Sequence, residues 1–252
     1  MGYVDAHCHL GSRHFDDDRS EMIGRMQESG VDRAIMICCS RHDLDHCLKL
    51  REGFPGFKLA WGIHPQDLED EHDDDRLVRF EKDLLEAQAD MIGEIGLDYY
   101  SHPHTKGSQI RFFEKQLEMA VKYDLPVDIH MRKASNDTLQ ILKKYPVRGI
   151  IHSFSGSVEM ARLFLKEGFY VSFGASILFK GARRPAQVIA DMPLDRLLIE
   201  TDAPYQSPVI DHRHEPADVI RIYEAIAQVK QISVEELQKI AAGNFDRIFV
   251  KA

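Results

Sequence analysis

The sequence predicts an α/β protein of the (β/α)8 TIM-barrel class, with residues 1–252 as a single domain. Eight short apolar or β-branched runs recur along the chain, each about as long as a strand buried on both faces of a parallel sheet. Longer amphipathic stretches separate the runs, an alternation typical of barrels of about 250 residues. The 252 residues are 44% hydrophobic and 29% charged, an ordinary globular composition with enough apolar material for a large core.

The nearest alternative is an open, doubly wound sheet, which would bind a ligand where the strand order reverses. Such a sheet usually carries a glycine-rich phosphate loop directly after its first strand. Here the first run leads into the segment DAHCHL, residues 5–10, and no such loop follows. This difference favours the barrel.

The expected strands are the eight apolar runs, which end near residues able to bind a metal or a substrate. In chain order they are Tyr3–Ala6, Arg33–Cys38, Lys58–Ile63, Met91–Leu97, Pro126–His130, Gly149–His152, Phe169–Phe173 and Leu197–Glu200.

Apolar residues at helical spacing predict helices between these strands, over Ser20–Ser29 and Asp74–Ala87 and from about Val158 to a C-cap near Gly168. The capping box Ser233–Glu236 predicts the start of a last helix. The clearest pattern is Ser108–Tyr123, with one apolar stripe formed by Ile110, Phe113, Leu117, Ala120 and Val121.

Charge and composition exclude several classes of function. The net charge of −9 argues against a long, nonspecific grip on duplex nucleic acid, which normally needs a basic stripe. No apolar run approaches the roughly 20 residues that span a bilayer, and the N-terminus lacks a signal-peptide pattern. We therefore expect a cytoplasmic protein with no membrane contact and no stable protein partner. We interpret the acidic run Asp16–Asp18 as the solvated start of a helix, where the helix dipole favours negative charge.

Four cysteines, Cys8, Cys38, Cys39 and Cys47, form no CxxC pattern. We predict reduced, largely buried thiols, with Cys8 as a packing residue rather than a metal ligand.

The pair His7 and His9 is the first indication of chemistry. On an extended strand, side chains at i and i+2 point to the same face, so both imidazoles can bind one ion. The pair alone could equally be two structural histidines near the chain end. Further potential ligands occur at the ends of later runs, and in a barrel such positions face one common mouth. They are Glu94, His130, His152 and Asp202.

Four histidines and two carboxylates are about the set that two divalent ions share, with water in the remaining positions. A structural zinc site would instead be closed and rich in cysteine. The sequence therefore predicts two catalytic divalent ions, and this mixture of ligands is compatible with Zn, Mg, Mn, Co or Ni.

Six segments together resemble the TatD-like metal-dependent hydrolases of the amidohydrolase superfamily, and the resemblance runs nearly end to end. The segments are DAHCHL (5–10), GIHP (62–65), GEIGLDYY (93–100), LPVDIHMR (125–132), HSFSGS (152–157) and ETDAPY (200–205). Members of this superfamily are distorted (β/α)8 barrels, and many TatD-like proteins are described as metal-dependent deoxyribonucleases.

The resemblance implies a role for each of the six residues. His7 and His9 match ligands of a first metal, and Glu94 matches a carboxylate that bridges both metals. His130 and His152 match ligands of the second metal. Asp202 matches an aspartate that binds the first metal and faces the catalytic water. Glu94 and Asp202 are thus the expected catalytic residues, and for Asp202 two roles stay open: proton acceptor, or metal ligand alone.

Three further residues are candidates for substrate binding: His64, Arg132 and Arg213. Arg132 could bind phosphate in a bidentate way or pair with a surface acid. His64 could contact a substrate phosphate or a metal-bound water, or simply end its strand as a polar residue. Family members often show Arg-Asn-Glu-Pro where this chain reads RHEP at 213–216, and Arg213 stays a candidate phosphate contact.

The function expected first is a two-metal phosphodiesterase, a deoxyribonuclease acting on DNA or oligonucleotide ends. A hydrolase of ester or amide bonds, including aminoacyl-tRNA esters of the D-aminoacyl type, is the enzymatic alternative, because activated water can attack carbonyl and phosphoryl centres alike. A metal-binding scaffold without activity is the alternative from another class. The choice of nucleic acid as substrate rests on family analogy.

Overall fold

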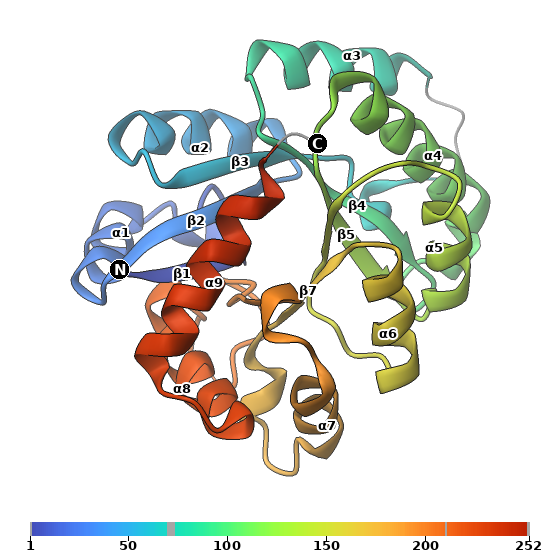
Figure 1. Cartoon of the computed structure of the whole chain (residues 1–252). Coiled ribbons are helices and arrows are strands. Elements are labelled where there is room, and N and C mark those ends of the chain that lie inside the picture. Colours follow the sequence, from blue (N-terminus) through green and yellow to red (C-terminus); the bar gives the residue numbers. More distant parts are fainter. Residues whose placement is uncertain (1, 70–73, 210, 251–252) are drawn as a thin grey trace.

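The structure is a computed structural model, and it describes residues 2–69, 74–209 and 211–250. Eight parallel strands pair in chain order and form a nearly closed barrel (Figure 1). All eight predicted strands are present. Their bounds are β1 Tyr3–Cys8, β2 Val31–Cys38, β3 Phe57–Trp61, β4 Met91–Asp98, β5 Val127–Arg132, β6 Gly149–Ile151, β7 Tyr170–Phe173 and β8 Leu197–Ile199. The predicted barrel is confirmed.

Residues just after β8 join the last strand to the first. The backbone N–H of Asp202 donates to the carbonyl oxygen of His7 at 2.9 Å, and that of His9 donates to the carbonyl of Ala203 at 2.7 Å. Closure of the barrel therefore brings three of the predicted metal ligands, His7, His9 and Asp202, to one place, although Asp202 follows the two histidines by almost 200 positions in the chain.

Helices surround the strands (Figure 1). The five predicted helices are present as α1, α3, α4, α6 and α9, whose bounds are given at the end of this paragraph. The N–H of Glu236 donates to Ser233 Oγ at the start of α9, and Gly168, with a φ of +88°, follows α6 as expected. The described helices are α1 Arg19–Glu28, α2 Arg41–Gly53, α3 Asp74–Glu86, α4 Lys106–Tyr123, α5 Ser135–Leu142, α6 Val158–Lys166, α7 Arg183–Asp191, α8 Val219–Lys230 and α9 Val234–Ile248.

The apolar stripe predicted for α4 is partly wrong. Val121 is 41% exposed, whereas Gln109 and Gln116 are buried. The two amides bond strand ends: Gln109 accepts from the N–H of Asp98, and Gln116 accepts from the N–H of Ile63. A buried backbone group needs a hydrogen-bond partner, so polar side chains occupy the inner face of this helix.

Two apolar clusters stabilise the barrel on either side of its strands. Inward-facing residues such as Ile35, Ile37 and Leu198 form the inner cluster together with Phe245 of α9. Asn244 of α9 donates to the carbonyl of Leu197, where β8 begins, so this helix covers the N-terminal end of the barrel. The opposite, C-terminal end is left for the functional site.

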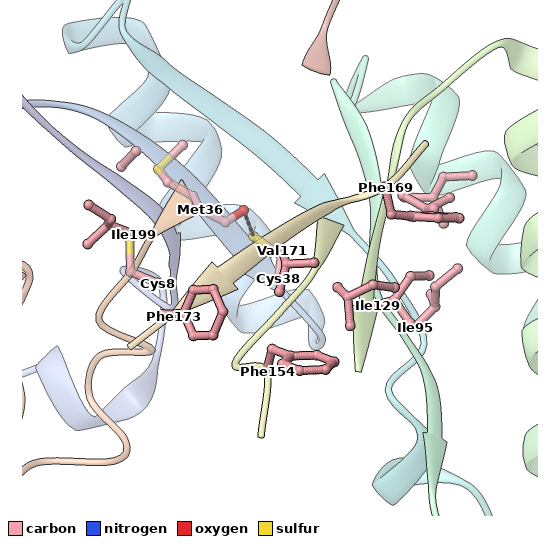
Figure 2. Close-up of a cluster of buried hydrophobic side chains, with 14 of the residues drawn as sticks. Cys8, Met36, Cys38, Ile95, Ile129, Phe154, Phe169, Val171, Phe173 and Ile199 are labelled. Carbon is pink, nitrogen blue, oxygen red and sulfur yellow. Dashed lines mark hydrogen bonds between the residues drawn. The ribbon is translucent and has the colours of Figure 1, made fainter. Parts of the chain in front are cut away.

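The outer cluster lies between strands and helices and includes Cys8, which packs near Phe173 and Ile199 (Figure 2). All four cysteines are free thiols, and Cys8, Cys38 and Cys47 are buried, as predicted. Within the described ranges, no helix is both long and apolar enough to cross a membrane.

Candidate metal centre

A cavity of about 620 Å³ opens at the C-terminal end of the barrel. Seven of the nine residues singled out in the sequence line it, and His7 lies fully buried beneath it. The seven are His9, His64, Glu94, His130, Arg132, His152 and Asp202. The barrel thus brings together side chains from six strands or the loops that follow them.

The first group of potential ligands consists of His7, His9 and Asp202. The Nε2 atoms of the two histidines lie 3.3 Å apart. Oδ1 of Asp202 lies 3.5 Å from Nε2 of His7 and 3.4 Å from Nε2 of His9. His7 is the second-last residue of β1 and His9 is the first residue after it, so the end of one strand supplies both histidines.

The second group consists of the three histidines with a ring nitrogen near Oε1 of Glu94, namely His130, His152 and His64. By the spacing of their ligand atoms, Glu94 forms one possible metal-binding set with His64 and His130 and another with His7 and His152. Oε1 of Glu94 lies 2.5 Å from Nδ1 of His130, 2.9 Å from Nε2 of His152 and 3.3 Å from Nε2 of His64. The structure therefore places His64 among potential metal ligands, whereas the sequence suggested a substrate contact. A histidine that follows a strand by three positions gives no sequence signal that separates these two roles.

Glu94 lies between the two groups. Its Oε1 atom faces the histidines of the second group, and its Oε2 atom lies 3.6 Å from Nε2 of His7 and 3.8 Å from Nε2 of His9. Glu94 stands in the middle of β4, whereas the sequence predicted it among the residues at the ends of the apolar runs. The pairing of β4 with β5 is irregular between Ile92 and Ile95, and such an irregularity can re-aim a side chain.

Each of three histidines has a second carboxylate behind its ring. Asp128 Oδ1 lies 3.0 Å from Nδ1 of His7, and Asp98 Oδ2 lies 3.3 Å from Nε2 of His130. Glu200 Oε1 lies 3.4 Å from Nδ1 of His152. Carboxylates in this position orient metal-binding imidazoles and raise their basicity.

Sequence reasoning missed Asp98 and Asp128 and treated Glu200 as structural or indirect. Asp128 precedes His130 by two positions on β5, so strand alternation could have indicated that it faces the barrel interior. Asp98 carries no comparable signal, because its partners Tyr100, Ser101 and Gln66 become neighbours only in the fold.

The acceptor atoms of these residues would repel one another unless a cation lay among them. With Nδ1 of His7 donating to Asp128, Nε2 of His7 faces carboxylate oxygens of Glu94 and Asp202, and this atom carries a lone pair whenever the ring is neutral. Lone pairs gathered this closely in a buried space repel each other unless a proton or a cation lies among them. The donor set of imidazoles and carboxylates suits divalent ions such as zinc or manganese.

The electrostatics of the centre point the same way. Burial opposes ionisation of Glu94, but His152, His64 and His130 outweigh it and hold the pKa of Glu94 well below its usual range. Burial and His7 oppose protonation of His152, but Glu94 and Glu200 prevail and raise its pKa to about 10. The centre thus favours positive charge among its carboxylates; protons supply it in the metal-free chain, and metal ions would displace them.

Asp202 has a left-handed backbone, with φ of +60°, which its neighbours hold in place. Buried Asp5 accepts from the N–H of Thr201 at 2.9 Å and from the Thr201 hydroxyl at 2.6 Å. Gln206 donates to Oδ2 of Asp202. These contacts orient Oδ1 of Asp202 toward the two histidines of the first group.

The other two predicted substrate contacts are in different places. Arg132 lines the cavity, with its guanidinium 4.2 Å from the centre of the exposed Tyr100 ring. Arg213 does not line it: the guanidinium forms a bidentate pair with Asp18 and also donates to Glu215. Its donors are already engaged with carboxylates, so Arg213 serves the structure and the predicted phosphate contact is not supported by its position.

An eight-stranded parallel barrel with two histidine–carboxylate groups at its C-terminal end defines the class of metal-dependent barrel hydrolases. The family described as TatD related DNase matches residues 4–250 of this chain. The chain belongs to this family.

Individual relatives are similar over nearly their whole length. The chain is 36% identical to the uncharacterized metal-dependent hydrolase YabD of Bacillus subtilis over 250 residues, covering 97% of this chain and 98% of that protein. It is 31% identical to the putative deoxyribonuclease tatdn3 of Danio rerio, covering 99% and 98%. The crystal structure of the TatD homologue YjjV of Escherichia coli superposes with a TM-score of 0.90 at 28% identity, covering 98% and 97%.

Proposed function

We propose that this metal-dependent hydrolase is a two-metal phosphodiesterase, a deoxyribonuclease that acts on DNA or oligonucleotide ends. The observation that supports the proposal most is the position of Glu94. Its two oxygens face two different groups of histidines, as expected of a carboxylate shared by two metal ions. The name of the family and of the relative tatdn3 favour DNA as the substrate.

Two ions would divide the residues between them. His7, His9 and Asp202 would hold one, His130 and His152 would hold the other, and Glu94 would bridge them. His64 is an additional candidate ligand on the second side. When bound, such ions activate water for attack and neutralise charge on a phosphoryl group.

The chain itself would supply proton transfer and orientation. Oδ1 of Asp202 faces the first group, while Oδ2 is tied to Gln206. Burial opposes ionisation of Asp202, but the adjacent His7 and His9 keep its pKa below the usual range, so it stays ionised. An ionised Asp202 can bind a metal ion and accept a hydrogen bond from water, and proton transfer to it would need metal ions in place of the protons on His7 and His9. Arg132 at the wall of the cavity would bind a phosphate oxygen of the substrate.

The cavity has the size and lining for a polar substrate with aromatic parts. Its 620 Å³ lies within the range of small-molecule sites. Two half-exposed or exposed tyrosines flank the opening: Tyr205 lines the cavity, and Tyr100 lies against Arg132. Aromatic faces of this kind stack on nucleobases. Because the net charge is −9, binding would depend on a strand end at the site rather than on a long backbone contact.

A metal-by-substrate screen on stripped, reconstituted protein tests the proposal. Zn, Mg, Mn, Co and Ni are each added with single-stranded DNA, a generic phosphodiester, and ester and amide substrates. We expect hydrolysis of DNA and the phosphodiester, and its near-complete loss in Glu94→Gln. The exposed-site variant Asp195→Asn serves as the control and keeps wild-type activity.

Other outcomes select the alternatives. Turnover confined to esters or amides, including aminoacyl-tRNA esters, would replace the proposed substrate class. Absence of turnover on every substrate by protein that has taken up metal would favour a binding scaffold.

A further inference from the structure

A second cluster of potential metal ligands lies outside the barrel cavity. Asp16 precedes α1, and His42 and His46 stand one turn apart on α2. Nε2 of His42 lies 3.0 Å from Oδ1 of Asp16, and the two imidazole rings have centroids 4.4 Å apart. One donor atom from each of the three residues lies within 4.8 Å of the others. None of the three lines the barrel cavity or contacts its ligand groups.

The hydrogen bonds around the cluster leave one ring nitrogen of His46 available, while Nε2 of His42 bonds Oδ1 of Asp16, a contact that a shared metal ion would replace. Nδ1 of His46 bonds the carbonyl oxygen of His42 at 2.9 Å, so it carries the proton and Nε2 of His46 presents a lone pair. Within the described hydrogen bonds, this Nε2 atom has no partner. His42 and His46 occupy positions i and i+4, which lie on one face of a helix.

We propose that Asp16, His42 and His46 form a separate binding site for one transition-metal ion of the zinc, nickel or copper class. Two imidazoles and one carboxylate are the donors that these ions prefer, whereas magnesium and calcium favour oxygen ligands. Water would complete the coordination, because all three residues are partly accessible to solvent.

The guanidinium of Arg19 already lies near the cluster. The groups around Arg19 offset its positive charge and so allow a metal ion to bind nearby. Arg19 donates to Oδ1 of Asp16 at 2.6 Å, but its guanidinium also donates to the carbonyl oxygens of Leu10, Gly11 and Ser12. These three dipoles and the negative net charge of the chain offset the charge of Arg19.

The site would connect two segments that border the cavity. Arg19 links Asp16 to residues 10–12, which directly follow His9, and Asp43 beside His42 lines the cavity. A metal ion held by Asp16 and α2 would therefore fasten the loop after β1 to α2. This inference does not depend on the proposed nuclease activity.

Nickel binding to stripped protein tests the inference. The chain is dialysed against Ni²⁺ over a range of free concentrations, and nickel per chain is measured by atomic emission. We expect wild type to bind about one equivalent more than His46→Gln at saturation. Asp16→Asn should weaken this equivalent roughly tenfold or more, since even indirect contacts to a metal are worth 10–100-fold.

His104→Gln is the matched control, because His104 is exposed and also lies beside another histidine, His102, with ring centroids 5.8 Å apart. It should bind as much nickel as wild type. Circular dichroism verifies that each variant is folded, and Asp16→Asn decides the outcome if His46→Gln is not. Equal nickel content in wild type, His46→Gln and Asp16→Asn, or an equal loss in His104→Gln, would overturn the inference.

Discussion

At the scale of single residues, carboxylates organise the centre as much as histidines do. Glu94 contacts both groups of ligands, and Asp128, Asp98 and Glu200 each lie behind one imidazole. Asp128 and His7 are both fully buried, so a charge on either one needs the other. The carboxylate of Asp128 fixes Nδ1 of His7 as the protonated atom and leaves Nε2 free to bind a metal ion.

Replacing this carboxylate by an amide should weaken the centre without removing a direct ligand. In Asp128→Asn the side-chain oxygen can still accept from Nδ1 of His7, but the negative charge is lost. We expect metal affinity to fall about 10–100-fold, measured by competition with a chromogenic chelator. Asp195→Asn, at an exposed position, should retain wild-type affinity. An unchanged affinity in Asp128→Asn would show that this contact does not support the ligand.

The sequence indicated the histidines because each lies near the C-terminal end of a buried strand or just after it, and these ends meet at one mouth. The carboxylates behind them were harder to predict. A buried Asp within an apolar strand, such as Asp128, resembles any polar interruption until the barrel defines what it faces. His64 shows the same limit, since its neighbours His130 and Glu94 come from other strands.

At the scale of elements, β4 and β5 set the second group. Gly96 on β4 pairs with His130 on β5 and has a φ of +143°. A Cβ atom at Gly96 would lie 2.1 Å from the carbonyl oxygen of His130. The close approach of the two strands therefore requires glycine here.

Gly96→Ala should disturb both folding and the metal centre. The methyl group would force β4 and β5 apart and displace His130, at a cost of about 1–3 kcal/mol or more in the free energy of unfolding. Gly24→Ala is the matched control: Gly24 is inside α1 with no atom near the added Cβ, and it should gain up to about 1 kcal/mol. Urea titration measures both. Equal stability of the two variants would contradict this account of the strand pair.

The strands were predictable as elements because burial on both faces makes each a predominantly apolar run. The buried faces of the helices were harder to predict from the sequence. In α4 the inner positions Gln109 and Gln116 satisfy backbone groups of strand ends, a requirement that hydrophobic periodicity does not express.

At the scale of the whole molecule, an ion-pair network fastens the segment after β8 to the segment before α1. Arg213 and Arg25 each contact both Asp18 and Glu215. Asp18 belongs to the acidic run Asp16–Asp18, which we interpret from the sequence as the solvated start of a helix. Its partner Arg213 lies 195 positions away, so only closure of the barrel reveals the pair.

This network predicts a pH dependence of stability. Hydrogen bonds from Arg213 and Arg25 hold the pKa of Asp18 well below its usual range. A lowered pKa in the folded state stabilises the fold fully above the unfolded value of about 3.9, and the contribution is lost as pH falls below it. The destabilisation caused by Asp18→Asn should therefore be larger at pH 6.5 than at pH 3.

Urea midpoints of wild type and Asp18→Asn, taken at both pH values, measure this difference. The control variant Asp195→Asn should have the same urea midpoint as wild type at both pH values. A gap between wild type and Asp18→Asn that is constant or grows toward pH 3 would exclude the network as the source.

The central claim is that residues from five strands and the loops after them hold a pair of metal ions with Glu94 between them. The most direct test is a crystal grown with Mn²⁺, with anomalous diffraction locating the ions. We expect two peaks about 3.5–4 Å apart, one beside His7, His9 and Asp202, the other beside His130 and His152, with Glu94 contacting both. A single peak, or two peaks that Glu94 does not join, would contradict the account.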